Sequence, residues 1–264
     1  MILKYKKIRT PVHVSVLLHL NIDFLFITYI HILMKMLGLV GGLSWISTID
    51  YYRQISLGFN EEFGKSNFGK CIIYSLNYQE AIDNNARGDF EATYQMVQDA
   101  AINLKFAGAT AIVLCANTLY MFADRLEETV KLPVIHIAKA TANEINKQGL
   151  KKIGLLGTKP TMEMDFYKSI LKDYGIEPII PDEADRNYVH EKIFAELGKD
   201  IIKPETKAGY MNIINKLLHN GAEGIILGCT EIPLLIKQSD CSCPIFDTTV
   251  IHAKAAVEFA LSNP

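Results

Sequence analysis

The chain repeats part of its own sequence, and this repeat constrains the fold more than any other feature. GLVGGLS, starting at residue 38, resembles GLLGTKP at 154. AGATAIVLCANT at 107 resembles NGAEGIILGCTE at 220, and LPVIH at 132 resembles CPIFD at 243. The three matches occur in the same order and at similar separations. Ordered matches of this kind predict two similar halves, related by a pseudo-two-fold axis.

Short apolar runs alternate with longer amphipathic stretches, which is typical of parallel sheets covered by helices. We expect strands at 36–41, 70–76, 110–115, 133–137, 152–157, 177–181, 224–229 and 244–248, and helices that include 46–59, 90–106, 161–174, 184–197, 206–219 and 249–261. With 264 residues, the chain can bury two small cores. We therefore predict an α/β fold with a first half at 36–150 and a second at 151–264. Its C-terminal segment can return to the first half.

Residues 1–35 differ from the rest of the chain. Four basic residues precede a mostly apolar run, a pattern seen in signal segments and membrane anchors. Polar residues and one acid, Asp23, interrupt the run, and such groups are costly in hydrocarbon. Met34 and Met36 stand directly before the first globular segment. We expect 1–35 to be an upstream start or a disordered arm, with membrane association as the alternative.

The charge and the cysteine usage exclude several classes of protein. Residues 1–35 carry five of the 27 basic side chains and one of the 29 acidic ones, so the remaining body is acidic and has no basic run. We therefore expect no nucleic-acid partner. Five cysteines are too few for a disulfide scaffold and fit a reducing, cytoplasmic setting. Cys241 and Cys243 lack the spacing of a zinc site, so we expect no metal.

Two apolar runs end in a cysteine beside small polar residues, and they are VLCANT (113–118) and LGCTEIPLL (227–235). Ligands of open α/β sheets bind beyond the carboxyl ends of the strands, so both segments should face a cleft between the halves. Each segment suits a helix start, whose free N–H groups attract anions and lower the pKa of a nearby thiol. Two thiols facing each other across a carboxylate could remove and return a proton on opposite faces of a carbon.

The segments GLVGGLSWISTIDYYRQI (38–55), VLCANT and LGCTEIPLL resemble the aspartate/glutamate racemase family. Within it, they are most similar to a short bacterial branch with a GGMSWEST-type motif. The resemblance covers about residues 36–264. It implies a homodimeric, PLP-independent amino-acid racemase, an isomerase that needs no cofactor. Such an enzyme interconverts the L and D forms of aspartate, glutamate or a related small amino acid through cysteine acid/base chemistry.

The resemblance also implies roles for individual residues. Cys229 falls on one catalytic position, and Cys115 is the candidate for the other. Substrate-binding roles fall on side chains beside the two cysteines and in the first glycine loop. Two further candidates are a residue after the second strand and a lysine near the position of a lysine in the family. These residues are Asn117, Thr118, Thr230, Glu231, Ser44, Thr48, Asn85 and Lys199.

The first cysteine departs from the family pattern, in which the catalytic residue stands directly before Asn-Thr. Ala116 occupies that place here, and the internal repeat likewise pairs Ala116 with Cys229 and Cys115 with Gly228. Neighbouring side chains on a strand point to opposite faces, so Cys115 points away from the cleft unless a bulge turns it. Tyr120 also replaces a histidine, and Ile46 replaces an acidic residue.

Two further functions therefore stay open on the sequence alone. A decarboxylase or isomerase with a single thiol would need to deliver only one proton. A non-catalytic protein that binds small amino or dicarboxylic acids would use the same cleft.

Overall fold

The computed structural model describes residues 34–262. The expectation for residues 1–35 therefore lies outside the described residues, except for Met34 and Lys35. Among the helices within residues 34–262, none is both long enough and apolar enough to cross a membrane.

The first part of the chain builds a parallel sheet of three strands in the order β2-β1-β3. Its elements are β1 (Leu37–Gly41), α2 (Trp45–Phe63), β2 (Cys71–Ser75), α3 (Tyr78–Ala86), α4 (Phe90–Phe106), β3 (Ala111–Leu114), the 3₁₀ helix η1 (Asn117–Phe122), α5 (Ala123–Val130) and α6 (Ile137–Lys147). Helix α4 packs on one face of this sheet, and α2 packs on the other.

The second part builds a parallel sheet of four strands in the order β5-β4-β6-β7. Its elements are β4 (Lys152–Gly157), α7 (Lys159–Glu163), α8 (Asp165–Asp173), β5 (Glu177–Ile179), α9 (Glu183–Ala195), η2 (Leu197–Lys199), α10 (Pro204–His219), β6 (Gly224–Gly228), α11 (Ile232–Leu235), η3 (Gln238–Asp240), β7 (Ile245–Asp247) and α12 (Thr248–Leu261). The predicted α/β class with two parallel sheets is confirmed.

The two sheets share one register, as the internal repeat predicts. Val40 of β1 pairs with Leu114 of β3, and the repeat-related Leu156 of β4 pairs with Leu227 of β6. Two of the predicted elements differ from the structure. The strand expected at 133–137 forms only a single bridge, between Ile112 and Val134. The equivalent segment of the second sheet forms the full strand β7. The helix expected at 161–174 is two helices, because Met164 has an extended backbone between them.

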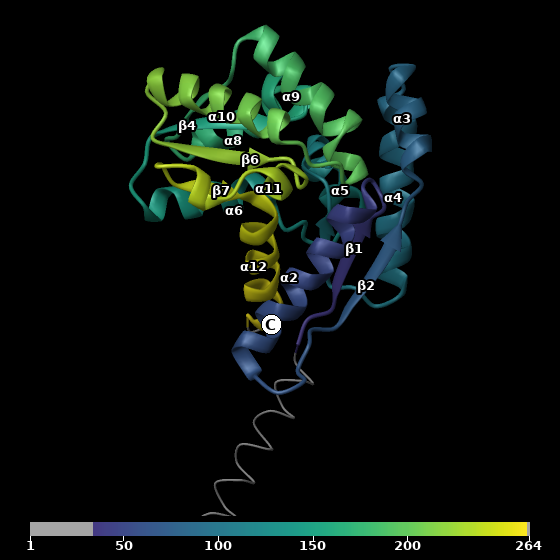
Figure 1. Cartoon of the computed structure of the whole chain (residues 1–264). Coiled ribbons are helices and arrows are strands. Elements are labelled where there is room, and N and C mark those ends of the chain that lie inside the picture. Colours follow the sequence, from purple (N-terminus) through teal and green to yellow (C-terminus); the bar gives the residue numbers. More distant parts are fainter. Residues whose placement is uncertain (1–33, 263–264) are drawn as a thin grey trace, which may run out of the picture.

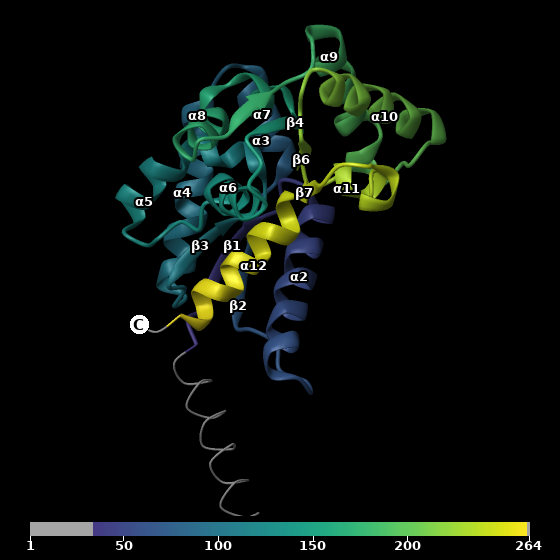
Figure 2. The same cartoon turned by 90° about the vertical axis from the view of Figure 1, so that its left-hand side faces the viewer.

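Each sheet and the helices that cover it form one lobe. The two lobes exchange a helix, and this exchange joins them. Helix α12 comes from the end of the chain but packs along α2 of the first sheet, as two perpendicular views show (Figures 1 and 2). Helix α6 comes before β4 but packs against α8 of the second sheet. The helices α6 and α12 also contact each other. Each lobe is therefore completed by a helix that the other half of the chain supplies.

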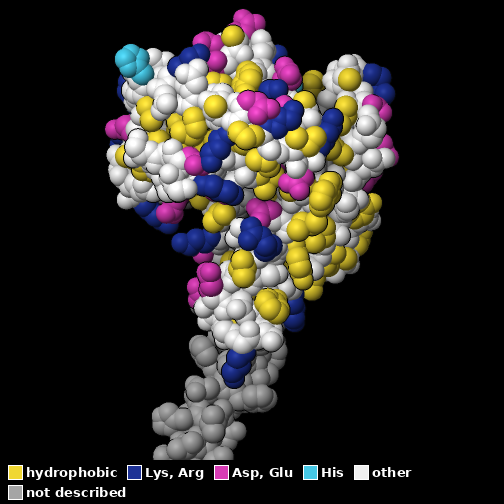
Figure 3. All heavy atoms as spheres, viewed as in Figure 1, with side chains coloured by type: hydrophobic (Ala, Val, Ile, Leu, Met, Phe, Trp, Pro, Cys, Tyr) yellow, Lys and Arg dark blue, Asp and Glu magenta, His cyan; other side chains and the backbone are white. Residues whose placement is uncertain are grey.

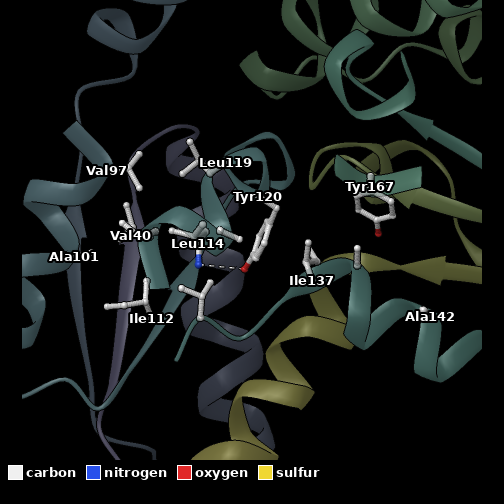
Figure 4. Close-up of a cluster of buried hydrophobic side chains, with 14 of the residues drawn as sticks. Val40, Val97, Ala101, Ile112, Leu114, Leu119, Tyr120, Ile137, Ala142 and Tyr167 are labelled. Carbon is white, nitrogen blue, oxygen red and sulfur yellow. Dashed lines mark hydrogen bonds between the residues drawn. The ribbon is translucent and has the colours of Figure 1, made fainter. Parts of the chain in front are cut away.

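The largest apolar cluster continues from one lobe into the other. Val40 and Leu114 belong to it in the first sheet, and Tyr167 of α8 belongs to it in the second lobe. Ile137 of α6 lies between the two groups (Figure 4). This cluster thus spans the pseudo-two-fold axis, which makes large independent motions of the lobes costly.

A buried histidine links the exchanged helix α12 to the first sheet. The Tyr51 hydroxyl donates to Nδ1 of His252 over 2.7 Å, and Nε2–H donates to the Ile135 carbonyl, also over 2.7 Å. Tyr120 donates to the same carbonyl and accepts the Leu114 N–H (Figure 4). Burial lowers the pKa of His252 to about 3, because charging the ring would require its desolvation. His252 is therefore neutral in the folded protein.

We predict that acid destabilises this protein through its buried histidines. Burial lowers the pKa of His136 to about 4 and that of His252 to about 3, from 6.5 for both, so the unfolded chain binds more protons below pH 6.5. The free energy of unfolding should fall between pH 7 and pH 5, by about 2 kcal/mol for His252 alone. Urea unfolding at the two pH values measures this loss.

Matched variants assign the acid effect to the buried ring. His252→Gln should be less stable at pH 7 but should lose less stability on acidification. His219→Gln, at an exposed histidine in the last turn of α10, should behave as wild type. Equal losses of stability in wild type and His252→Gln would contradict the assignment.

Candidate active site

A cavity of about 250 Å³ lies between the lobes, where β3 and β6 end. The first lobe contributes the segment after β3 and the start of α3. The second lobe contributes the segment after β6, the end of α9 and η2. The lining includes Tyr78, Ala116, Asn117, Thr118, Thr158, Lys199, Cys229, Thr230 and Glu231. Residues 34–262 contain no cluster of three or more His, Cys, Asp or Glu side chains that could hold a metal ion.

Cys229 and Glu231 form a buried pair at the second-lobe side of the cavity. The Cys229 thiol donates to Oε2 of Glu231 over 2.9 Å, and the Thr230 hydroxyl donates to the same oxygen over 2.9 Å. All three residues are buried, with at most 8% of each exposed. The carboxylate is thus held in place by two donors and faces the sulfur directly.

The structure reverses one expectation about this thiol. The sequence suggests that a helix start lowers its pKa, and the N–H groups of Thr230 and Glu231 do act in that direction. Burial of the thiol and the negative charge of Glu231 outweigh them and raise the pKa of Cys229 well above its usual value. The following helix, α11, has only four residues. Without substrate, the proton therefore resides on the sulfur.

Cys115 lies on the opposite side of its strand from the cavity. Its N–H donates to the Val40 carbonyl over 2.9 Å, and Ala116 after it has an extended backbone, so no bulge turns the thiol. The Cys115 side chain is 2% exposed and packs in the apolar cluster between the first sheet, α2 and α12. Burial raises the pKa of this thiol. The side chain that lines the cavity here is the methyl group of Ala116.

Five of the eight predicted binding residues line the same cavity, and these are Asn117, Thr118, Lys199, Thr230 and Glu231. The Asn117 amide donates to the Thr248 hydroxyl over 3.2 Å. Its Oδ1 is buried and finds no hydrogen-bond donor among the described residues. A substrate ammonium group is a donor that could satisfy it.

The other three predicted binding residues lie elsewhere. Asn85 lines an adjoining chamber, where its Oδ1 accepts the Thr93 hydroxyl over 2.9 Å. Ser44 and Thr48 are not among the side chains that line either space. Ser44 caps α2, and the Thr48 hydroxyl donates to the Ser44 carbonyl and accepts the Gly42 N–H. Both residues therefore shape the glycine loop.

Sequence reasoning missed two polar residues of the cavity. Tyr78 begins α3 directly after β2, and burial, Cys229 and Glu231 all raise its pKa, so the phenol stays neutral. The hydroxyl groups of Thr158 and Thr118 lie 3.2 Å apart and join the lobes at the cavity. The repeat offered a signal for Thr158, because it aligns this residue with Gly42 of the first glycine loop. For Tyr78, the only signal in the sequence was its position shortly after a predicted strand.

Comparisons with known proteins show which family this chain resembles. Residues 40–256 match the Asp/Glu/hydantoin racemase family. The broad specificity amino-acid racemase RacX of Bacillus subtilis (strain 168) is 24% identical over 230 residues, which are 86% of this chain and 99% of that protein.

Two crystal structures show the same fold along their whole length. One is of a proposed Asp/Glu racemase from Yersinia pestis, with 47% identity, a TM-score of 0.81, and 87% of this chain and 100% of that chain covered. The other is of an aspartate racemase homologue from Pyrococcus horikoshii OT3, with 36% identity, a TM-score of 0.76 and the same coverage. The chain therefore belongs to the Asp/Glu/hydantoin racemase family, whose members are isomerases.

We predict that Glu231 controls when Cys229 ionises. In Glu231→Gln, the negative charge that raises the thiol pKa is gone, so Cys229 should react with iodoacetamide at lower pH than in wild type. Peptide mapping by mass spectrometry after timed alkylation follows each cysteine separately.

Glu205→Gln is the control, because Glu205 lies exposed in the first turn of α10 and does not line the cavity. It should leave the pH profile of Cys229 unchanged. A Glu231→Gln profile that shifts to higher pH, or does not move, would contradict the role of the carboxylate.

Proposed function

We propose that this protein is a cofactor-independent amino-acid racemase in which Cys229 is one acid/base. The observation that carries the proposal is the buried Cys229–Glu231 pair in a cavity between two pseudo-symmetric lobes. Membership of a racemase family supports the same reaction. The substrate is an amino acid, placed with its α-carbon beside the sulfur.

The pair can supply a base without a bound cofactor. In the free site the sulfur holds the proton, because burial and the carboxylate disfavour a thiolate. A substrate ammonium group adds positive charge to the site and favours transfer of that proton to Glu231. The thiolate then takes the α-proton, and the electron pair of the broken C–H bond delocalises into the substrate carboxylate. The hydroxyl groups of Thr118 and Thr230 and the Lys199 ammonium can stabilise this charge.

The opposite face of the α-carbon lies toward Ala116, whose methyl group can neither donate nor accept a proton. We propose that the second proton comes from water or from a hydroxyl group of the cavity, with Tyr78 the candidate whose pKa responds to Cys229 and Glu231. A neutral phenol donates a proton poorly at neutral pH. Inversion should therefore be slower than removal of the α-proton.

We predict that Cα hydrogen exchange exceeds inversion. In D₂O, NMR should show deuteration of an L-amino acid at least about tenfold faster than chiral chromatography shows the D form. Cys229→Ser should abolish both signals. Ala116→Cys should bring inversion closer to exchange, because it places a thiol where the repeat puts the partner of Cys229.

Cys115→Ser is the matched control, since it changes the neighbouring residue on the face turned away from the cavity. It should keep the ratio of exchange to inversion. Loss of exchange in Cys115→Ser but not in Cys229→Ser would overturn the assignment of the base.

The single thiol also favours a second candidate, a decarboxylase. Loss of CO₂ from a disubstituted malonate leaves a carbanion that needs one proton on one face, which Cys229 alone can deliver. Release of CO₂ from alkyl- or arylmalonates, with no exchange in any amino acid, would select this function.

We further propose a cytoplasmic homodimer. All five cysteines are free, which supports a reducing compartment. Trp45, Ile49 and Tyr52 are 63%, 57% and 50% exposed and form one stripe on α2. Ile73 and Tyr74 are exposed on the edge strand β2, and Figure 3 shows hydrophobic side chains gathered over this region. An apolar stripe beside an unpaired strand edge suits a two-fold contact with a second copy.

Light scattering should give twice the chain mass of 29.6 kDa. Ile49→Glu should shift the protein to monomer, because it places a charge in the apolar stripe. Phe106→Glu, at the end of α4 on the other face of the first sheet, should remain a dimer. A monomeric wild type would contradict the proposed contact.

A further inference from the structure

A second chamber of about 410 Å³ adjoins the cavity that contains Cys229. The two spaces share wall residues, among them Ile82, Ala116, Thr118 and Phe194, so they form one continuous cleft. The chamber lies between α3, α4 and η1 of the first lobe and α7 and α9 of the second. A substrate held at Cys229 can therefore extend a side chain into it.

The wall of this chamber is mainly apolar. Apart from the shared residues, it is formed chiefly by Ala81, Phe90, Leu119, Met121, Phe122 and Pro160. Two polar side chains, Asn85 and Thr93, also line it, and they hydrogen bond to each other. Among the described residues, the lining of the chamber includes no Asp, Glu, Lys or Arg.

The chamber has one histidine, and that ring is not a cation. Nδ1 of His190 accepts the Lys159 N–H over 3.2 Å, and its ring packs edge-on against Phe194 at 4.8 Å between centroids. Burial and the nearby Lys159 ammonium lower its pKa, which keeps it neutral. Lys199 lines the cavity with Cys229 and not the chamber.

The residues of the chamber wall decide which substrate side chains the chamber can hold. A carboxylate in the chamber would lose its hydration and find no opposite charge, which is costly. An apolar side chain would leave water and contact Met121, Phe90 and Leu119, which is favourable. Lys199 then remains available for the α-carboxylate beside the sulfur.

We infer that this chamber is the side-chain site of the substrate, and that it selects amino acids with large apolar side chains, such as methionine, leucine and phenylalanine, over aspartate and glutamate. The inference rests on the proposed function for the position of the α-carbon, and it names the substrate class of that same site.

Protection of Cys229 from iodoacetamide tests the chamber without requiring turnover. L-Methionine should protect Cys229 at a concentration at least about tenfold lower than L-glutamate or L-aspartate requires. Cα exchange in D₂O, measured on the same amino acids, should follow the same order. Stronger protection by the acidic amino acids would overturn the inference.

A charge swap at the wall gives a second, independent measurement. Met121→Lys places a cation in the chamber at similar side-chain length, so the ratio of glutamate to methionine protection should rise at least about tenfold. Met164→Lys makes the same change at an exposed methionine between α7 and α8, and this ratio should stay as in wild type. Equal ratios in both variants would overturn the inference.

The outcomes also separate this inference from the racemase proposal. Protection by methionine without exchange in any amino acid would support the chamber and refute the proposed reaction. Exchange of aspartate and glutamate in preference to methionine would support the reaction and refute the chamber.

Discussion

The packing of α12 against α2 is the contact on which the rest of the structure depends. It carries the end of the chain back to the first sheet, while α6 makes the reciprocal contact with α8 in the second lobe. Apolar side chains of both helices lie in the cores of the lobes they join. The carboxyl ends of β3 and β6 are thereby held opposite each other across the cavity.

Within that frame, burial sets the chemistry of the site. A low dielectric and a neighbouring carboxylate keep the proton on Cys229 in the free site. Burial also keeps Tyr78 neutral, on the first-lobe side of the cavity. A site of this kind keeps the thiol protonated when no substrate is present, and in the proposed reaction the positive charge of an amino acid favours formation of the base.

The site is also asymmetric, although the fold is nearly symmetric. The repeat places Cys229 and Ala116 at equivalent positions, so the proposed base lies on one side of the cavity and a methyl group occupies the equivalent place on the other. The adjoining chamber adds a second asymmetry, because α3, α4 and η1 of the first lobe supply most of its apolar wall. Membership of the family shows the racemase class, whereas the proposals on the second candidate reaction, the rate and the substrate rest on these local differences.

The sequence by itself determined the parallel α/β class and the two similar halves, because both follow from local patterns that repeat along the chain. It also predicted that Ala116, not Cys115, would occupy the position equivalent to Cys229, since alternation along an extended strand decides which face a side chain takes. Only the tertiary structure decided the exchange of α6 and α12, the raised pKa of Cys229 and the apolar chamber. Each of these depends on which distant segments come into contact. The local sequence contains no pattern that predicts a buried charge or an apolar cavity wall.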